Sequence, residues 1–186
     1  MSNLNRMATK LTAKMLANKI IADDMSDIYI YGFELLLSFL FSTTIIVIVG
    51  ILLGRILQTL IFLLIFVLLR SFTGGYHANT YAMCTVVTFS IFGGVLLLSE
   101  LVVLPLFLYA ILASLGFVIM LVLVPLEHPN KKITDLQKRK YKKMSIILFW
   151  MFVTIGALLC YAGIQLNTVI FFTLVADLLL LFVKSR

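Results

Sequence analysis

The sequence predicts an all-α integral membrane protein, with six membrane-spanning helices behind an N-terminal amphipathic helix. Of its 186 residues, 62% are hydrophobic, whereas a soluble globular domain is about 45–50% apolar. The mean hydropathy is +1.14. The apolar residues come in long runs, and a helix needs about 20 such residues to cross a bilayer. Basic residues gather beside these runs, as the positive-inside rule describes.

Residues 3–22 are predicted to form an amphipathic helix on the cytosolic side of the membrane. Its apolar residues recur every three or four positions: Leu4, Met7, Leu11 and Met15. Its basic residues fall on another face: Arg6, Lys10 and Lys14. Such a helix either lies in the membrane interface, with its basic residues toward anionic headgroups, or packs on the cytosolic face of the protein itself. We therefore expect residues 1–27 to form a cytosolic segment, with membrane lipid as a partner, before a transmembrane domain over 28–186.

The transmembrane domain is predicted to contain six apolar helices separated by turns or polar stretches. Their expected ranges are 29–53, 56–69, 82–99, 101–125, 146–164 and 168–183. Gly50, Gly54 and Arg55 divide the first two, and residues 165–167 form a turn between the last two. The second run is the shortest, so its helix is tilted, broken or extended backward to Ile51. The two glycines would let helices approach closely, in internal packing or in a homodimer contact.

The positions of the basic residues predict the orientation of these helices. Thirteen of the fifteen basic residues lie in the N-terminal segment, in a polar stretch over 127–144, or at the C-terminal end. With six crossings, all three regions fall in the cytoplasm together with the segment 70–81, and the positive-inside rule is satisfied. We therefore predict cytoplasmic termini and a basic cytosolic loop at 127–144. Because the basic clusters flank apolar runs, we expect no nucleic-acid partner.

One polar stretch, RSFTGGYHANTYAMC at 70–84, interrupts the apolar runs. Each of its features has an ordinary structural explanation: an arginine reaching the headgroups, two glycines in a turn, an interfacial histidine and a small buried cysteine. Together, however, a cysteine and a histidine are the minimum for covalent acyl transfer, with a thiolate as nucleophile and an imidazole as base. The combination predicts a catalytic segment in which His77 and Cys84 are the reacting pair and Arg70 adds positive charge.

The spacing of His77 and Cys84 restricts how the two side chains can meet. They are seven residues apart, so on one straight helix about 10 Å would separate them, whereas proton transfer needs about 3 Å. We therefore expect a helix that begins after His77, with Asn79 or Thr80 as its N-cap. Cys84 then lies in the first or second turn of that helix, where the helix dipole favours a thiolate.

This stretch resembles the signature of the accessory gene regulator B (AgrB) family of bacterial membrane endopeptidases. The likeness includes the arginine, the Gly-Gly-Tyr-His core and the cysteine, and it extends to the basic amphipathic start and to the basic stretch before the last two helices. The resemblance implies a cysteine endopeptidase of the bacterial cell membrane that removes the C-terminal part of an AgrD-type precursor peptide. It implies that the precursor becomes a cyclic thiolactone pheromone for quorum sensing. It places the catalytic pair on His77 and Cys84, and supporting roles on Arg70 and Gly75.

Further polar residues are candidates for contact with the substrate. Glu34 and Asp177 are carboxylates within apolar runs, where a charge is costly, and we favour a structural or substrate-binding role for both. A third residue that orients the histidine stays open among these two and Asn79. The basic stretch, with Lys131 and Lys132, determines topology and is also expected to attract the acidic tail of a precursor.

Metal and cofactor chemistry finds no support in the sequence. The two histidines, His77 and His128, show no spacing typical of a metal site, and the two cysteines form no disulfide pattern. We expect no metal and no cofactor, and we interpret Cys160 as a packing residue. Two other functions stay open: a small membrane transporter, for which the phosphate-binding motif G-x4-G-K-S/T is missing, and a non-catalytic scaffold. Neither would need His77 or Cys84.

Overall fold

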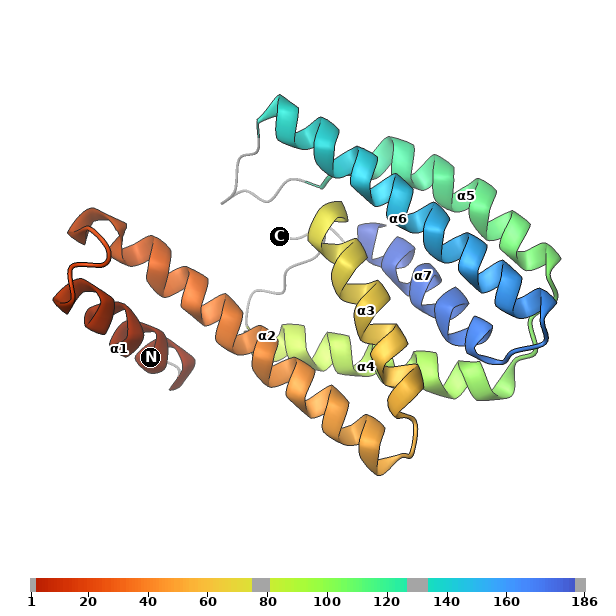
Figure 1. The fold of residues 1–186 in the computed structure, drawn as a ribbon, viewed down its shortest axis with the longest axis horizontal. Helices are drawn as coiled ribbons and strands as arrows, with labels where there is room; N and C mark the ends of the chain where they lie inside the picture. Colours follow the sequence, from red (N-terminus) through yellow and green to blue (C-terminus); the bar gives the residue numbers. More distant parts are fainter. Residues whose placement is uncertain (1–2, 75–80, 127–133, 183–186) are drawn as a thin grey trace.

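A computed structural model describes residues 3–74, 81–126 and 134–182 of the chain (Figure 1). Within these ranges the chain forms helices and connecting turns and contains no β-strand, which confirms the prediction of an all-α protein. The elements are α1 (Asn3–Ala17), η1 (Asp23–Met25), α2 (Ser26–Leu52), α3 (Ile56–Thr73), α4 (Tyr81–Leu101), α5 (Phe107–Leu123), α6 (Asp135–Tyr161) and α7 (Leu166–Phe182).

Helices α2 to α7 correspond to the six predicted apolar runs. Within the described residues, four helices are long and apolar enough to span a membrane: α2, α3, α4 and α6. Helices α5 and α7 are also apolar but have 17 residues each, which is the lower limit of the range of about 17–25 for one crossing. The chain is therefore a helical membrane protein, and the count of six crossings stays a prediction.

The boundary between the third and fourth predicted helices is wrong. The sequence predicts helices over 82–99 and 101–125, but α4 continues to Leu101 and α5 begins only at Phe107. Pro105 lies in the link between them. A proline has no N–H to donate and disfavours helical geometry in the residue before it, so the link is not helical.

The prediction of a polar loop over 127–144 is wrong for the second half of that range. Helix α6 begins at Asp135, well before the predicted start at 146. Thr134 and Gln137 form a capping box, in which the Gln137 amide donates to Thr134 Oγ1 over 3.4 Å and the Thr134 amide donates to Gln137 Oε1 over 3.0 Å. Because this pair satisfies two amides at the helix start, the helix begins within the basic stretch and carries its basic side chains on the first turns.

The end of α1 and the turn before α7 also differ from the predicted ranges. Helix α1 ends at Ala17 rather than at residue 22, and Lys19 adopts a positive φ of 54° in the turn that follows. The last two helices are joined around Gly163, whose φ is 70°, and Asn167 already belongs to α7. A left-handed residue of this kind ends a helix because it breaks the repeating backbone geometry.

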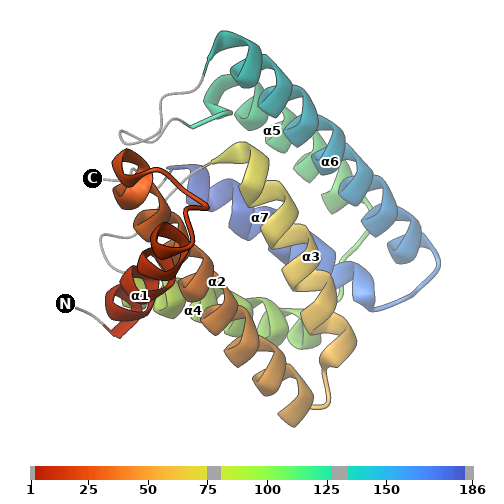
Figure 2. The same ribbon diagram turned by 60° about the vertical axis from the view of Figure 1, so that its left-hand side comes forward.

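Helix α7 lies between α3 and α6 at the centre of the bundle (Figures 1 and 2), and it also contacts α4 and α5. Two apolar clusters form the core. One draws on α3, α5, α6 and α7 and includes Leu69, Phe149 and Leu174. The other draws on α2, α3, α4 and α7 and includes Phe62 and Phe92. Since α3 and α7 contribute to both clusters, these two helices hold the bundle together.

Helix α1 packs along α2 (Figure 2). Ala8 and Thr12 are buried, and Asn5 Nδ2 donates to Glu34 Oε1 of α2 over 2.7 Å. Met7 and Leu11 are instead 54% and 41% exposed. Of the two expected placements of this helix, the structure shows the one in which it packs on the protein itself. Contact of the exposed apolar residues with lipid stays a prediction.

Gly50 allows α2 and α3 to approach closely. A Cβ added at Gly50 would overlap the side chain of Thr59, which is fully buried in α3. Gly54 has a φ of 67° and lies in the turn between the two helices, with open space around it. The internal packing that the sequence allowed is therefore present at Gly50, whereas Gly54 serves the turn.

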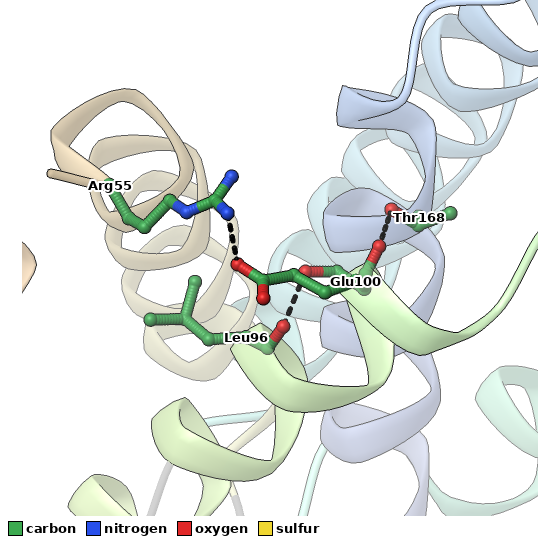
Figure 3. A network of polar contacts seen from close by, with 5 residues as sticks. Arg55, Leu96, Glu100 and Thr168 are labelled. Atoms are coloured by element: carbon green, nitrogen blue, oxygen red, sulfur yellow. Dashed lines mark hydrogen bonds and ion pairs between the residues drawn. The ribbon is translucent and has the colours of Figure 1, made fainter. Parts of the chain in front are cut away.

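A polar network joins three helix ends on one side of the molecule (Figure 3). Arg55, before α3, forms an ion pair of 2.5 Å with Glu100 near the end of α4. Thr168, at the start of α7, donates its hydroxyl to the Ser99 carbonyl over 3.1 Å. The start of α3, the end of α4 and the start of α7 thus meet at this end. The end of α3, the start of α4 and the end of α7 lie at the opposite end. The first two carry the described residues of the predicted catalytic segment.

Candidate active site

Arg70 and Cys84 lie at the same end of the bundle, on either side of the predicted catalytic segment. Arg70 is in the last turn of α3, and Cys84 is in the first turn of α4, which begins at Tyr81. Their side chains interact electrostatically, and Arg70 interacts in the same way with Asp177 of α7. Three helices thus bring one cation, one thiol and one carboxylate to the site.

The position of Cys84 suits a nucleophile. The thiol is free and half-buried, so it is accessible without being fully solvated. Because α4 begins at Tyr81, the amides of its first turn and the positive end of the helix dipole lie close to Cys84. The next residue, Thr85, forms a hydroxyl contact of 2.7 Å with Ser42, which fixes this turn of α4 against α2.

The Arg70 guanidinium is held against an aromatic ring on its own helix. Its Cζ atom lies 5.9 Å from the centroid of the Phe66 ring, one turn earlier in α3. Arg70 is half-buried. A cation over a ring face is stabilised there, so the guanidinium is directed along the helix surface near the catalytic end.

Gly74 brings the end of α3 against the segment after α5. The sequence predicted a turn at the two glycines that begin with Gly74, but it did not indicate this contact. The Leu126 amide donates to the Thr73 carbonyl over 3.0 Å. Gly74 has a φ of 71° and a ψ of −153°, and a Cβ added there would overlap the Leu126 carbonyl. Only glycine is suited to this backbone geometry. The ends of two described ranges, at Gly74 and at Leu126, are therefore joined by one backbone contact.

Several predicted site residues lie outside the described residues: Gly75, His77, Asn79, Lys131 and Lys132. Their predicted roles stay predictions. The N-cap predicted at Asn79 or Thr80 also lies outside the described residues.

The remaining candidates are separated from one another. Asp177 is buried within α7, whereas Glu34 is half-buried at the contact between α1 and α2. Cys160 packs against the apolar core near the end of α6, and its Sγ lies 3.3 Å from the Leu104 carbonyl. Among residues 3–74, 81–126 and 134–182, no group of three or more His, Cys, Asp and Glu side chains could hold a metal ion.

Comparison with known proteins agrees with the resemblance seen in the catalytic segment. The model of the accessory gene regulator B family matches residues 5–183, nearly the whole chain. The chain belongs to the AgrB family. AgrB-like proteins of Clostridium perfringens strain 13 and strain SM101 are each 27% identical to it over 167 residues, which cover 82% of this chain and 77% of theirs. No solved structure matches the chain.

AgrB membership supports a role in the agr quorum-sensing system. The AgrB family is known for peptide processing and implies a partner peptide of the AgrD type. Together with the apolar helices, this membership identifies the chain as a membrane protein.

Proposed function

We propose that the chain is a membrane cysteine endopeptidase that cuts an AgrD-type precursor peptide and promotes its cyclisation to a thiolactone. The observation that carries the proposal is the position of Cys84 in the first turn of α4, with the Arg70 guanidinium in electrostatic range. Helix dipole and guanidinium both stabilise a thiolate there. His77, four residues after the end of α3 at Thr73, supplies the base.

The cleavage step is a covalent acyl transfer. His77 takes the proton from the Cys84 thiol, and the thiolate attacks the carbonyl carbon of the scissile peptide bond. The oxyanion that forms is stabilised by Arg70 and by backbone amides at the start of α4. The C–N bond then breaks, the new amine takes the proton from the imidazolium of His77, and the acyl group stays on Cys84 as a thioester.

The cyclisation step exchanges one thioester for another. A cysteine within the precursor gives its proton to His77 and attacks the thioester carbonyl, and the Cys84 sulfur leaves and takes that proton back. Because the bonds broken and formed are of the same kind, the exchange costs little free energy. Water is the competing nucleophile, and a site among packed helix ends limits its access.

The orientation completes the proposal. The segment between α3 and α4 faces the cytoplasm, as do both termini, in a bacterial cell membrane. The basic residues at the start of α6 lie on the same side, as the positive-inside rule requires. The precursor therefore reaches the enzyme from the cytoplasm.

The test is processing of an AgrD-type peptide by the full chain in liposomes, followed by mass spectrometry. Wild type and Cys160→Ala should cut the peptide, and Cys84→Ala and His77→Ala should not, because only the last two remove the nucleophile or the base. A precursor-derived adduct on Cys84 should appear in the wild type. Cleavage that survives in Cys84→Ala would remove the catalytic role and leave the scaffold or transporter function.

A further inference from the structure

A buried carboxylate lies among the apolar residues of α7. Asp177 is 4% exposed, and its Oδ2 atom accepts no hydrogen bond from the part of the chain that the structure describes. Thr173 and Leu181, one turn to either side on the same face, are 0% and 4% exposed. A carboxylate in such a place is costly unless a charge partner is near, so its presence calls for a partner on a neighbouring helix.

Arg70 is the cation on the neighbouring helix α3 whose charge acts on Asp177. Helix α7 packs along α3, and both helices run from the end that holds the Arg55–Glu100 ion pair toward the catalytic end (Figure 1). Arg70 is in the last turn of α3, and Asp177 lies little more than one turn before the end of α7 at Phe182. The two side chains are therefore at a similar depth, and they interact electrostatically.

The surroundings of the pair are apolar. On α3, Leu69 belongs to one core cluster and Phe66 to the other. On α7, Leu178 and Leu180 are divided between the two clusters in the same way. Charge is screened only weakly in apolar surroundings, so a carboxylate and a guanidinium attract each other more strongly there than they do in water.

We propose that Asp177 is a positioning residue, which holds the Arg70 guanidinium toward Cys84. Electrostatic interactions then link three helices, α7, α3 and α4. The Asp177 carboxylate restrains Arg70, and Arg70 stabilises the negative charge that develops at Cys84. Asp177 touches no reacting atom. The inference rests on the proposed function, because the restrained guanidinium matters only if Cys84 reacts.

The test compares single and double variants by the rate of precursor cleavage at saturating precursor in liposomes. Asp177→Asn should lower the rate by about 100-fold, the loss typical of a small displacement of a catalytic group, with little change in KM. Arg70→Gln should lower it by a similar factor. The double variant should be no slower than Arg70→Gln alone, because Asp177 acts through Arg70. Asp177→Glu should recover part of the rate.

The matched control is Thr173→Val, which removes a buried polar group from the same face of α7 one turn away. Its hydroxyl bonds only to the Val169 carbonyl of its own helix among the described contacts, so the cleavage rate should stay at the wild-type value. A full rate in Asp177→Asn would overturn the inference. So would losses that multiply in the double variant, because Asp177 would then act independently of Arg70.

Thermal unfolding in detergent gives a readout that does not depend on catalysis. Each single variant leaves one charge without its counter-charge in apolar surroundings and should lower the apparent Tm, and the double variant should be more stable than Asp177→Asn. A double variant that is no more stable would overturn the pairing, even where Asp177→Asn fails to fold. If Cys84→Ala still cuts the precursor, the proposed function fails, and the Tm comparison alone decides on the pair.

Discussion

At the scale of single residues, Gly74 has a backbone geometry that is suited only to glycine. Gly74→Ala should cost about 1–3 kcal/mol of stability because its dihedral angles are suited only to glycine. It should also slow cleavage, since the added Cβ overlaps the Leu126 carbonyl and displaces the start of the catalytic segment. Thermal unfolding and cleavage rate check both effects. Gly93→Ala in α4, where the added Cβ meets nothing within 4 Å, is the control and should leave both unchanged or slightly raise stability.

The second prediction at this scale concerns the atom that carries the acyl group. If Cys84→Ser still cuts the precursor, it should release mainly linear peptide. An acyl group on a serine is an oxygen ester, and transfer from an ester to the precursor thiol is uphill, so water takes a larger share. The ratio of cyclic to linear product by mass spectrometry measures this. Efficient formation of the cyclic product by Cys84→Ser would contradict a thioester intermediate.

Within the site, the sequence predicted local features and missed those made by distant residues. The start of α4 just before Cys84 followed from the short distance that proton transfer needs. The role of Gly74 could not be read in this way, because its constraint comes from Leu126, far along the chain. The charge partner of Arg70 was equally hidden, since Asp177 belongs to the last helix. The only sequence feature that pointed to this interaction was the presence of a carboxylate in an apolar run.

At the scale of elements, the contact between α2 and α3 depends on one glycine. Gly50→Ala should lower the free energy of unfolding by about 1–3 kcal/mol, the usual cost of overpacking, because the new methyl group overlaps Thr59. Unfolding in mild detergent measures the change. Gly32→Ala in the same helix is the control, since its added Cβ meets nothing within 4 Å. Equal stability of the two variants would show that the helices separate without cost.

Hydropathy located the six apolar helices, and local backbone chemistry decided where they end. Pro105 and the capping box at Thr134 and Gln137 were both present in the sequence. The run of basic residues made 127–144 look like a solvated loop, although lysine and arginine are good helix formers. Composition therefore predicted polarity correctly there, and it did not decide between a loop and the charged first turns of a long helix.

At the scale of the whole molecule, the charged start of α6 lies beside the catalytic end of α3. The Phe72 and Tyr141 rings are 6.1 Å apart, edge to face, and Lys142 Nζ donates to the Leu121 carbonyl at the end of α5. These contacts hold the first turns of α6 against the ends of both helices. The basic side chains and Arg70 thus share one end of the bundle, which no local pattern in the sequence could establish.

This arrangement predicts that capture of an acidic precursor depends on salt. Arg139, Lys140 and Lys143 are exposed on the first turns of α6, and their attraction for an acidic tail acts over a screening length that falls from about 10 Å at 0.1 M salt to about 3 Å at 1 M. The KM for precursor should therefore rise with salt in one detergent, while the maximal rate changes little. Replacing these three residues by glutamine should raise KM at low salt and flatten its salt dependence. A wild-type KM that is equal at low and high salt would mean that the basic turns of α6 set the topology and do not bind the precursor.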